Sequence, residues 1–164
     1  MNKVVLLLGS NMGDRHFNLE KASVEINREF GKISRHSSVY ETAAWGNTNQ
    51  KKFLNQVVIL SSALPAEEMM KRIISMEEKM GRIRKEKWEP RIIDIDILFF
   101  NDEVISTPNV IVPHPGLHER KFTLKPLAEL IPGFIHPVLK KSIAELLEEL
   151  NDPLEVTKIS NHLA

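Results

Sequence analysis

The residues best suited to chemistry are two aspartates, Asp94 and Asp96, which alternate with isoleucines in the run Arg-Ile-Ile-Asp-Ile-Asp-Ile-Leu. This alternation predicts a β-strand with one apolar and one polar face. Strand geometry then places both Asp side chains on one face, roughly 7 Å apart. Several Lys and Arg residues lie between positions 72 and 91. Carboxylates for Mg²⁺ beside cations for phosphate oxygens suit a metal-bound polyphosphate, although a solvated strand face with ion pairs explains the same pattern.

Composition limits the class of protein without identifying it. The chain has 164 residues, which suits one domain, and its 42% hydrophobic content suffices for an ordinary core. Equal numbers of basic and acidic residues argue against a nucleic-acid-binding surface. The absence of cysteine excludes disulfides and thiolate metal sites. No apolar run approaches the roughly 20 residues of a membrane span, and the N-terminus lacks the features of a signal peptide, so we expect a cytoplasmic protein.

The order of expected elements favours an α+β fold. Strands are expected over residues 4–8, 33–40, 53–61 and 94–100, and helices over residues 14–30 and 65–80. This βαββαβ order predicts a ferredoxin-like core, a mainly antiparallel sheet with both helices on one face. After it we expect a hairpin over residues 104–112, a short helix starting at 126 and a last helix opened by a capping box at Ser142 and Glu145. Such folds host many functions.

Five further residues each allow a functional and a purely structural explanation. Phe53 and Asn55 share one strand face and suit a planar heterocycle, but Phe53 suits the core equally well. Trp45, in a polar loop, is either packed on that loop or a wall for a flat ligand. Glu77 falls beside the apolar stripe of its helix, where a solvated acid is the usual case. His114, between two prolines, is either presented to a ligand or a turn residue.

Three further segments contain residue types that could bind an anion or a flat ring. Residues 82–91 are strongly basic and contain Trp88, which suits a mobile lid over a bound anion better than an ordinary solvated loop. Arg120 and Phe122 again alternate a cation with an aromatic ring. Residues 9–13, Gly-Ser-Asn-Met-Gly, lack the Gly-Lys-Ser/Thr of a P-loop, so a strand-to-helix turn is the better explanation.

Taken together, these residues resemble a known family. Residues 87–98, Lys-Trp-Glu-Pro-Arg-Ile-Ile-Asp-Ile-Asp-Ile-Leu, are similar to the signature of the 6-hydroxymethyl-7,8-dihydropterin pyrophosphokinases. These folate-pathway enzymes transfer a pyrophosphoryl group from ATP to a pterin alcohol. The resemblance extends from about residue 4 to about residue 135, because further matching segments follow in the family's order and spacing: Gly9-Ser10-Asn11, Tyr40-Glu41-Thr42, Phe53-Leu54-Asn55, Glu77, Gly81-Arg82-Ile83-Arg84, Pro113-His114 and Arg120-Lys121-Phe122.

The resemblance implies a role for each candidate residue. Asp94 and Asp96 would be ligands of two Mg²⁺ ions that bridge the phosphates of ATP, the co-substrate. The pterin would stack between Phe53 and Phe122, with Asn55 at its edge and Thr42 and Trp45 nearby. The nucleotide and its phosphates would be bound by Glu77, Arg82, Trp88, Arg91, His114 and Arg120. The residues expected to act in catalysis are Arg82, Arg84, Arg91 and Asp96, the last as a candidate acceptor of the pterin hydroxyl proton.

Two other classes of protein remain as alternatives. A metal-dependent nucleotidyltransferase would use paired Asp residues in the same way, but it would transfer AMP and release pyrophosphate. An RNA-recognition domain would display aromatic residues on its sheet, although the neutral charge and the acidic strand argue against it. We expect small-molecule partners only, with no nucleic acid and no membrane, and a monomer that forms one domain over residues 1–164.

Overall fold

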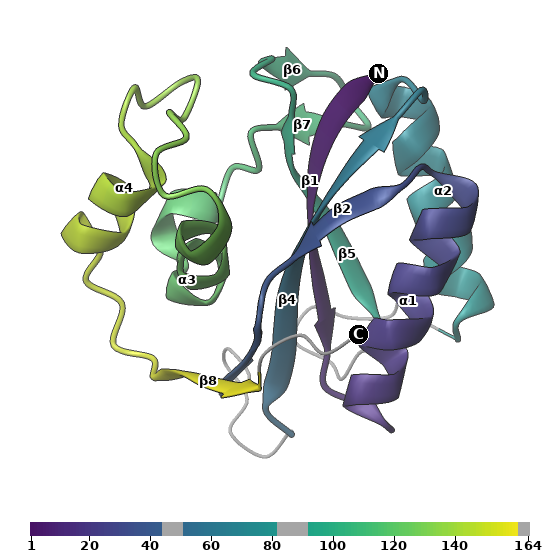
Figure 1. Ribbon diagram of the computed structural model, residues 1–164, viewed down its shortest axis with the longest axis horizontal. Coiled ribbons are helices and arrows are strands. Elements are labelled where there is room, and N and C mark those ends of the chain that lie inside the picture. The colour runs from purple at the N-terminus through teal and green to yellow at the C-terminus, as the bar shows by residue number, and fades with distance from the viewer. Residues whose placement is uncertain (44–50, 82–91, 161–164) are drawn as a thin grey trace.

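An antiparallel sheet forms the centre of the computed structural model, which describes residues 1–43, 51–81 and 92–160 (Figure 1). Its strand order is β5-β1-β4-β3-β8, and β2 pairs with β4 beside this path. Because every paired strand runs antiparallel to its neighbour, a residue and its partner across the ladder point to the same face. The strands are β1 (Asn2–Ser10), β2 (Ile33–His36), β3 (Val39–Thr42), β4 (Phe53–Ser62), β5 (Asp94–Phe100) and β8 (Val156–Ser160).

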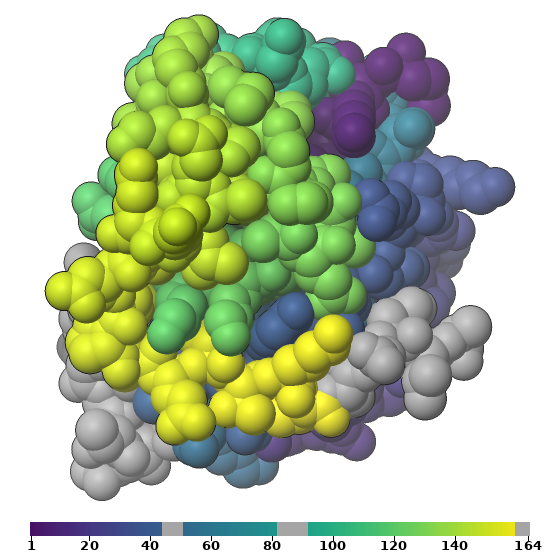
Figure 2. Space-filling view, turned by 60° about the vertical axis from the view of Figure 1, so that its left-hand side comes forward, coloured from purple at the N-terminus to yellow at the C-terminus, as the bar shows by residue number. Residues whose placement is uncertain are grey.

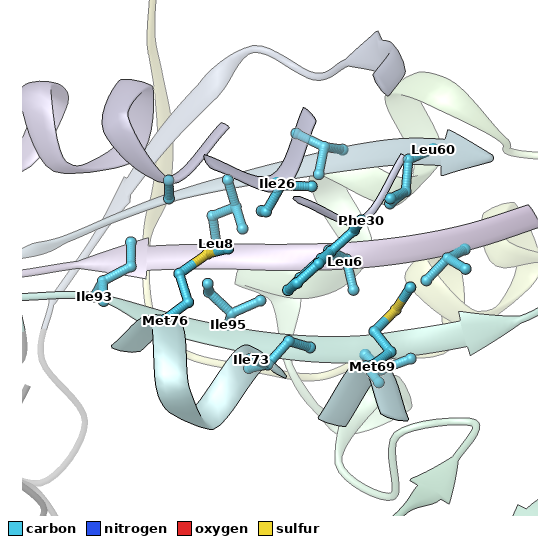
Figure 3. Packing of buried hydrophobic residues seen from close by; sticks show 14 of the residues in the cluster. Leu6, Leu8, Ile26, Phe30, Leu60, Met69, Ile73, Met76, Ile93 and Ile95 are labelled. Carbon is cyan, nitrogen blue, oxygen red and sulfur yellow. The ribbon is translucent and has the colours of Figure 1, made fainter. Parts of the chain in front are cut away.

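Helices α1 (Arg15–Glu29) and α2 (Ala66–Lys79) pack on one face of this sheet (Figure 1). Asp14 caps α1 by accepting the backbone N–H of Phe17, and Glu67 and Glu68 lie in the first turn of α2, where carboxylates are favoured. The buried stripes of both helices meet alternate residues of the central strands, and Figure 3 shows this cluster. It contains Leu6, Leu8, Ile26, Phe30, Leu60, Met69, Ile73, Met76, Ile93 and Ile95.

A second cluster covers part of the opposite face. Helices α3 (Lys121–Leu130) and α4 (Ile143–Glu149) contribute Leu124, Leu127 and Ile143, which pack with Leu7 and Val57 of the sheet. In Figure 2 the C-terminal part of the chain, green to yellow, covers this side of the molecule. A short 3-10 helix, η1 (Leu117–Glu119), precedes α3, and the hairpin β6 (Ile105–Ser106) and β7 (Ile111–Val112) precedes η1.

The predicted ferredoxin-like core, the hairpin and the capping box are confirmed, with one strand differing in detail. The strand expected over residues 33–40 is interrupted between β2 and β3. There, the Ser37 hydroxyl accepts the backbone N–H of Val57 at 2.9 Å, and the Ser38 N–H donates to the carboxylate of Glu129. Side chains therefore take two hydrogen bonds that a regular ladder would make between backbones.

Two features of the C-terminal third were not predicted. Helix α3 begins at Lys121 and not near Pro126, which lies inside it. The backbone N–H of Lys121 donates to the carboxylate of Asp152 at 3.1 Å, so the acceptor at this helix start comes from a distant part of the chain. Strand β8 adds to the sheet by pairing with β3. None of the helices in the described ranges has the length and apolar character of a membrane span.

Candidate active site

Strand β5 places the two aspartates on the sheet face opposite α1 and α2. Asp94 pairs with Gly9 and Asp96 with Leu7, a residue of the cluster under α3 and α4. The intervening Ile95 is buried in the cluster under α1 and α2. Asp94 and Asp96 are each only partly buried. The expected separation of polar and apolar faces is therefore confirmed, and both carboxylates lie at an accessible part of the same face.

A row of residues crosses the sheet beside Asp94. The register places Asp94 opposite Gly9, Gly9 opposite Asn55, and Asn55 opposite Tyr40. Since neighbouring strands lie about 4.8 Å apart, Asn55 lies about 10 Å from Asp94 along this row. Phe53 is two residues from Asn55 and shares its face. Asp94 therefore shares one face of the sheet with Asn55 and Phe53, two of the predicted pterin-binding residues.

Gly9 lies at the centre of this row and is essential to its shape. A Cβ atom built on Gly9 would lie 2.8 Å from Nδ2 of Asn55 and 3.8 Å from Cδ1 of Phe53. The glycine therefore provides the space in which the Asn55 amide lies. The sequence interpretation placed Gly9 in a turn, whereas it belongs to β1, and only its neighbours in β4 show that an added side chain would displace the Asn55 amide.

Two buried polar atoms of this region lack a hydrogen-bond partner within the described structure. They are Oγ1 of Thr42 and Oδ1 of Asn55, and both residues are at most 5% exposed. The other amide atom of Asn55, Nδ2, donates to the carbonyl of Leu8 at 3.3 Å. A buried acceptor without a donor costs about 1–3 kcal/mol, so a ligand that presents N–H groups to these atoms would recover that energy.

Glu77 is not the solvated helix acid that its position beside the apolar stripe indicated. The residue is 1% exposed, and its Oε2 accepts the backbone N–H of Ile95 at 2.8 Å. Ile95 lies between Asp94 and Asp96, so the carboxylate of Glu77 holds the backbone that carries both. The pattern of α2 could not reveal this, because the partner of Glu77 is a backbone group of a later strand.

His114 faces the aspartates from the segment after β7. Its Nδ1 accepts the backbone N–H of Gly116 at 3.1 Å, so the ring proton is on Nε2, which lies 4.0 Å from Oδ2 of Asp96. Burial and the nearby Arg120 cation lower the pKa of His114 to about 4, although the charge of Asp94 opposes this. The ring is therefore neutral near pH 7, and it forms neither an ion pair nor a hydrogen bond with Asp96. It can donate Nε2–H to an anion at the site.

Arg120 and Phe122 flank the start of α3, close to His114. The Arg120 guanidinium carbon lies 5.8 Å from the centroid of the Phe122 ring. The same guanidinium lies against Gly116, where an added Cβ would be 3.0 Å from it. One region therefore contains the Arg120 cation, the neutral ring of His114 and the two aspartates. The other five predicted site residues, Trp45, Arg82, Arg84, Trp88 and Arg91, lie outside the described residues.

The donor set suits a cation that shares its coordination with phosphate. Among the described residues no group of three or more His, Cys, Asp or Glu side chains is arranged to hold a metal ion. Mg²⁺ is commonly bound by one or two carboxylates together with water and substrate phosphates. Two partly exposed Asp side chains on one strand face fit that mode of binding, and they do not fit a closed structural metal site.

Comparison with known proteins identifies the family. Residues 5–132 match the family described as 7,8-dihydro-6-hydroxymethylpterin-pyrophosphokinase (HPPK). The chain belongs to this family. A 2-amino-4-hydroxy-6-hydroxymethyldihydropteridine pyrophosphokinase of Aquifex aeolicus is 45% identical over 149 residues, which are 91% of this chain and 92% of the relative. The enzyme of the same name from Bacillus subtilis is 40% identical over 132 residues, 79% of each chain.

Solved structures agree with the HPPK fold. The HPPK-DHPS protein of Plasmodium falciparum superposes with a TM-score of 0.75 at 22% identity over 90% of this chain. This chain spans only 41% of that longer protein. At such low identity the likeness supports the fold, and the family assignment depends on the sequence matches.

Proposed function

We propose that this HPPK-family chain transfers pyrophosphate from ATP to 6-hydroxymethyl-7,8-dihydropterin, giving AMP and the pterin diphosphate. The hydroxymethyl oxygen attacks the β-phosphorus of ATP, the bond between that phosphorus and the oxygen bridging to the α-phosphate breaks, and AMP leaves. The reaction is direct, without a covalent enzyme intermediate. The observation that carries this proposal is the row from Asp94 through Gly9 to Asn55, which joins an acidic pair to an amide suited to a heterocycle.

Asp94 and Asp96 are proposed to be the residues that would hold Mg²⁺, in the family's case two ions. Mg²⁺ held there would neutralise phosphate charge and help to align the reacting phosphorus. The separation of the two carboxylates along one strand supports this assignment. Asp96 is also the candidate to accept the proton of the attacking hydroxyl.

The pterin is proposed to lie over β4 near Gly9. Oδ1 of Asn55 and Oγ1 of Thr42 are buried acceptors suited to the N–H groups of a pterin edge. Phe53 and Phe122 supply aromatic faces, and aromatic stacking is favourable for a flat ring. Trp45 is assigned to the rim of this pocket on the basis of the family resemblance.

The nucleotide is proposed to bind beside β5. His114 presents a neutral Nε2–H donor and Arg120 a permanent cation, both suited to phosphate oxygens. The family resemblance assigns phosphate binding and a closing loop to Arg82, Arg84, Trp88 and Arg91. It also assigns Glu77 to the nucleotide site. Loop closure would exclude water that competes with the pterin hydroxyl.

Product identification tests the reaction. The protein is mixed with MgATP and 6-hydroxymethyl-7,8-dihydropterin, and the products are analysed by mass spectrometry and phosphorus NMR. AMP and the pterin diphosphate, formed only with Mg²⁺, are expected. Pyrophosphate with an adenylylated product would instead identify a nucleotidyltransferase, which no feature of the described residues favours.

We further propose that the chain acts as a cytoplasmic monomer of one domain. Light scattering of the purified protein would test the oligomeric state.

A further inference from the structure

The buried carboxylate of Glu77 requires an explanation beyond helix stability. Acidic side chains are rarely fully buried unless they are paired, because removal of a carboxylate from water is costly. Glu77 is 1% exposed, on the face of α2 that contacts β5, and the backbone N–H of Ile95 is one of its partners. Its immediate neighbour Glu78 is exposed, so α2 has a solvated position for an acid one residue away.

The position of Ile95 explains why a hydrogen-bond acceptor is placed there. In the order β5-β1-β4-β3-β8, strand β5 lies at one end, and β1 is its only strand neighbour in the described structure. Backbone groups of successive residues in a strand point alternately to its two sides. The N–H of Ile95 is taken by Glu77 of α2 at 2.8 Å, so the helix supplies the acceptor on the side of β5 away from β1.

Both metal-binding candidates depend on this short piece of backbone. Asp94 is the first residue of β5, where a strand is least constrained, and Asp96 follows Ile95 directly. Ile95 itself is 3% exposed, so loss of its acceptor would leave a buried N–H unpaired, which is unfavourable. Fraying of this end of β5 would relieve that cost and would move both carboxylates.

We propose that Glu77 is a positioning residue: by holding the N–H of Ile95, it fixes the spacing and direction of Asp94 and Asp96 for the metal–phosphate complex. This role rests on the proposed function for its effect on the reaction. It differs from direct contact with the nucleotide, because it acts through a backbone hydrogen bond that a neutral amide oxygen can also accept.

The test compares Glu77→Ala with Glu77→Gln, using Glu78→Ala as the matched control on the exposed face. Substitution of groups that orient metal ligands typically costs about 10–100-fold in metal affinity or activity. For Glu77→Ala we expect kcat to fall and the Mg²⁺ concentration for half-maximal rate to rise, each by about that factor, with little change in the KM for the pterin. Glu77→Gln should recover most of the loss, and Glu78→Ala should match the wild type.

Amide hydrogen exchange at Ile95 provides a readout that does not depend on turnover. The Ile95 N–H should be protected in the wild type and in Glu77→Gln, and should exchange faster in Glu77→Ala, while residues of β1 and β4 stay protected. If Glu77→Gln is as inactive as Glu77→Ala while Ile95 stays protected, the carboxylate charge acts directly and the positioning role is wrong. Unchanged exchange in Glu77→Ala would also refute it. Neither exchange result depends on which product the enzyme forms, so failure of this inference is distinguishable from failure of the proposed reaction.

Discussion

Replacement of Gly9 by alanine should separate pterin recognition from folding. The new Cβ would lie 2.8 Å from Nδ2 of Asn55, whereas ordinary contact begins at 3.4 Å, so the amide must retreat by about 0.6 Å. Only the tip of a side chain has to move, and the hydrogen bond at risk is the 3.3 Å bond to the Leu8 carbonyl. The free energy of unfolding should therefore fall by only about 1 kcal/mol.

The effect on the reaction should be much larger than the effect on stability. A misplacement of about 1 Å in a binding group can cost about 100-fold in rate. We expect Gly9→Ala to lower kcat/KM for the pterin by about 10–100-fold, mainly through KM, with MgATP affinity nearly unchanged. Steady-state kinetics with varied pterin, calorimetry of MgATP binding and urea unfolding measure the three quantities.

Gly133→Ala is the matched control, because an added Cβ at Gly133 would meet no atom within 4 Å. The double variant Gly9→Ala/Asn55→Ala tests whether Gly9 acts through Asn55. If it does, the two losses in kcat/KM should not add, since residues that share an interaction are coupled. If Gly9→Ala has the same kcat/KM as Gly133→Ala, the predicted displacement of Asn55 is wrong. It is also wrong if the losses in kcat/KM of Gly9→Ala and Asn55→Ala are fully additive.

Three further predictions concern charge. Asp94→Ala and Asp96→Ala should each abolish most Mg²⁺-dependent turnover while the thermal unfolding temperature stays near that of the wild type; turnover of Asp96→Ala near the wild-type rate would disprove the metal assignment. Burial and Arg120 lower the pKa of His114 to about 4, so its ring should show no NMR titration between pH 5.5 and 8. Because the unfolded chain binds the His114 proton more tightly than the folded chain does, the contribution of His114 to stability should decline as pH falls from about 6.5 towards 4. For Glu129, burial alone would raise the pKa, but hydrogen bonds from Tyr40 and Ser38 outweigh this effect and lower the pKa. The wild type should therefore be more stable than Glu129→Gln, with the full advantage above pH 4.5, the ordinary pKa of Glu, and a shrinking advantage as pH falls through the lower pKa of the folded state. Urea unfolding at a series of pH values measures this difference.

Local patterns in the sequence predicted the core of the fold. The alternation of Asp and Ile around Ile95 identified a strand and the face that carries its carboxylates, and the capping box at Ser142 identified a helix start. These features succeed because backbone geometry repeats over two or about four residues, so the residues that decide them are neighbours in the chain. The start of α3 was missed because its acceptor, Asp152, is distant in sequence.

The sequence by itself determined the residue types for the chemistry: paired carboxylates, a histidine held between prolines, and an amide beside an aromatic ring. Only the tertiary structure decided which of them meet. Strand register sets Gly9 between Asp94 and Asn55, and the packing of α2 against the end strand turns Glu77 from an apparent surface acid into the buried acceptor of Ile95. The physical reason is that a polar group's role depends on the partner placed opposite it, and that partner is chosen by pairing and burial between segments far apart in the chain.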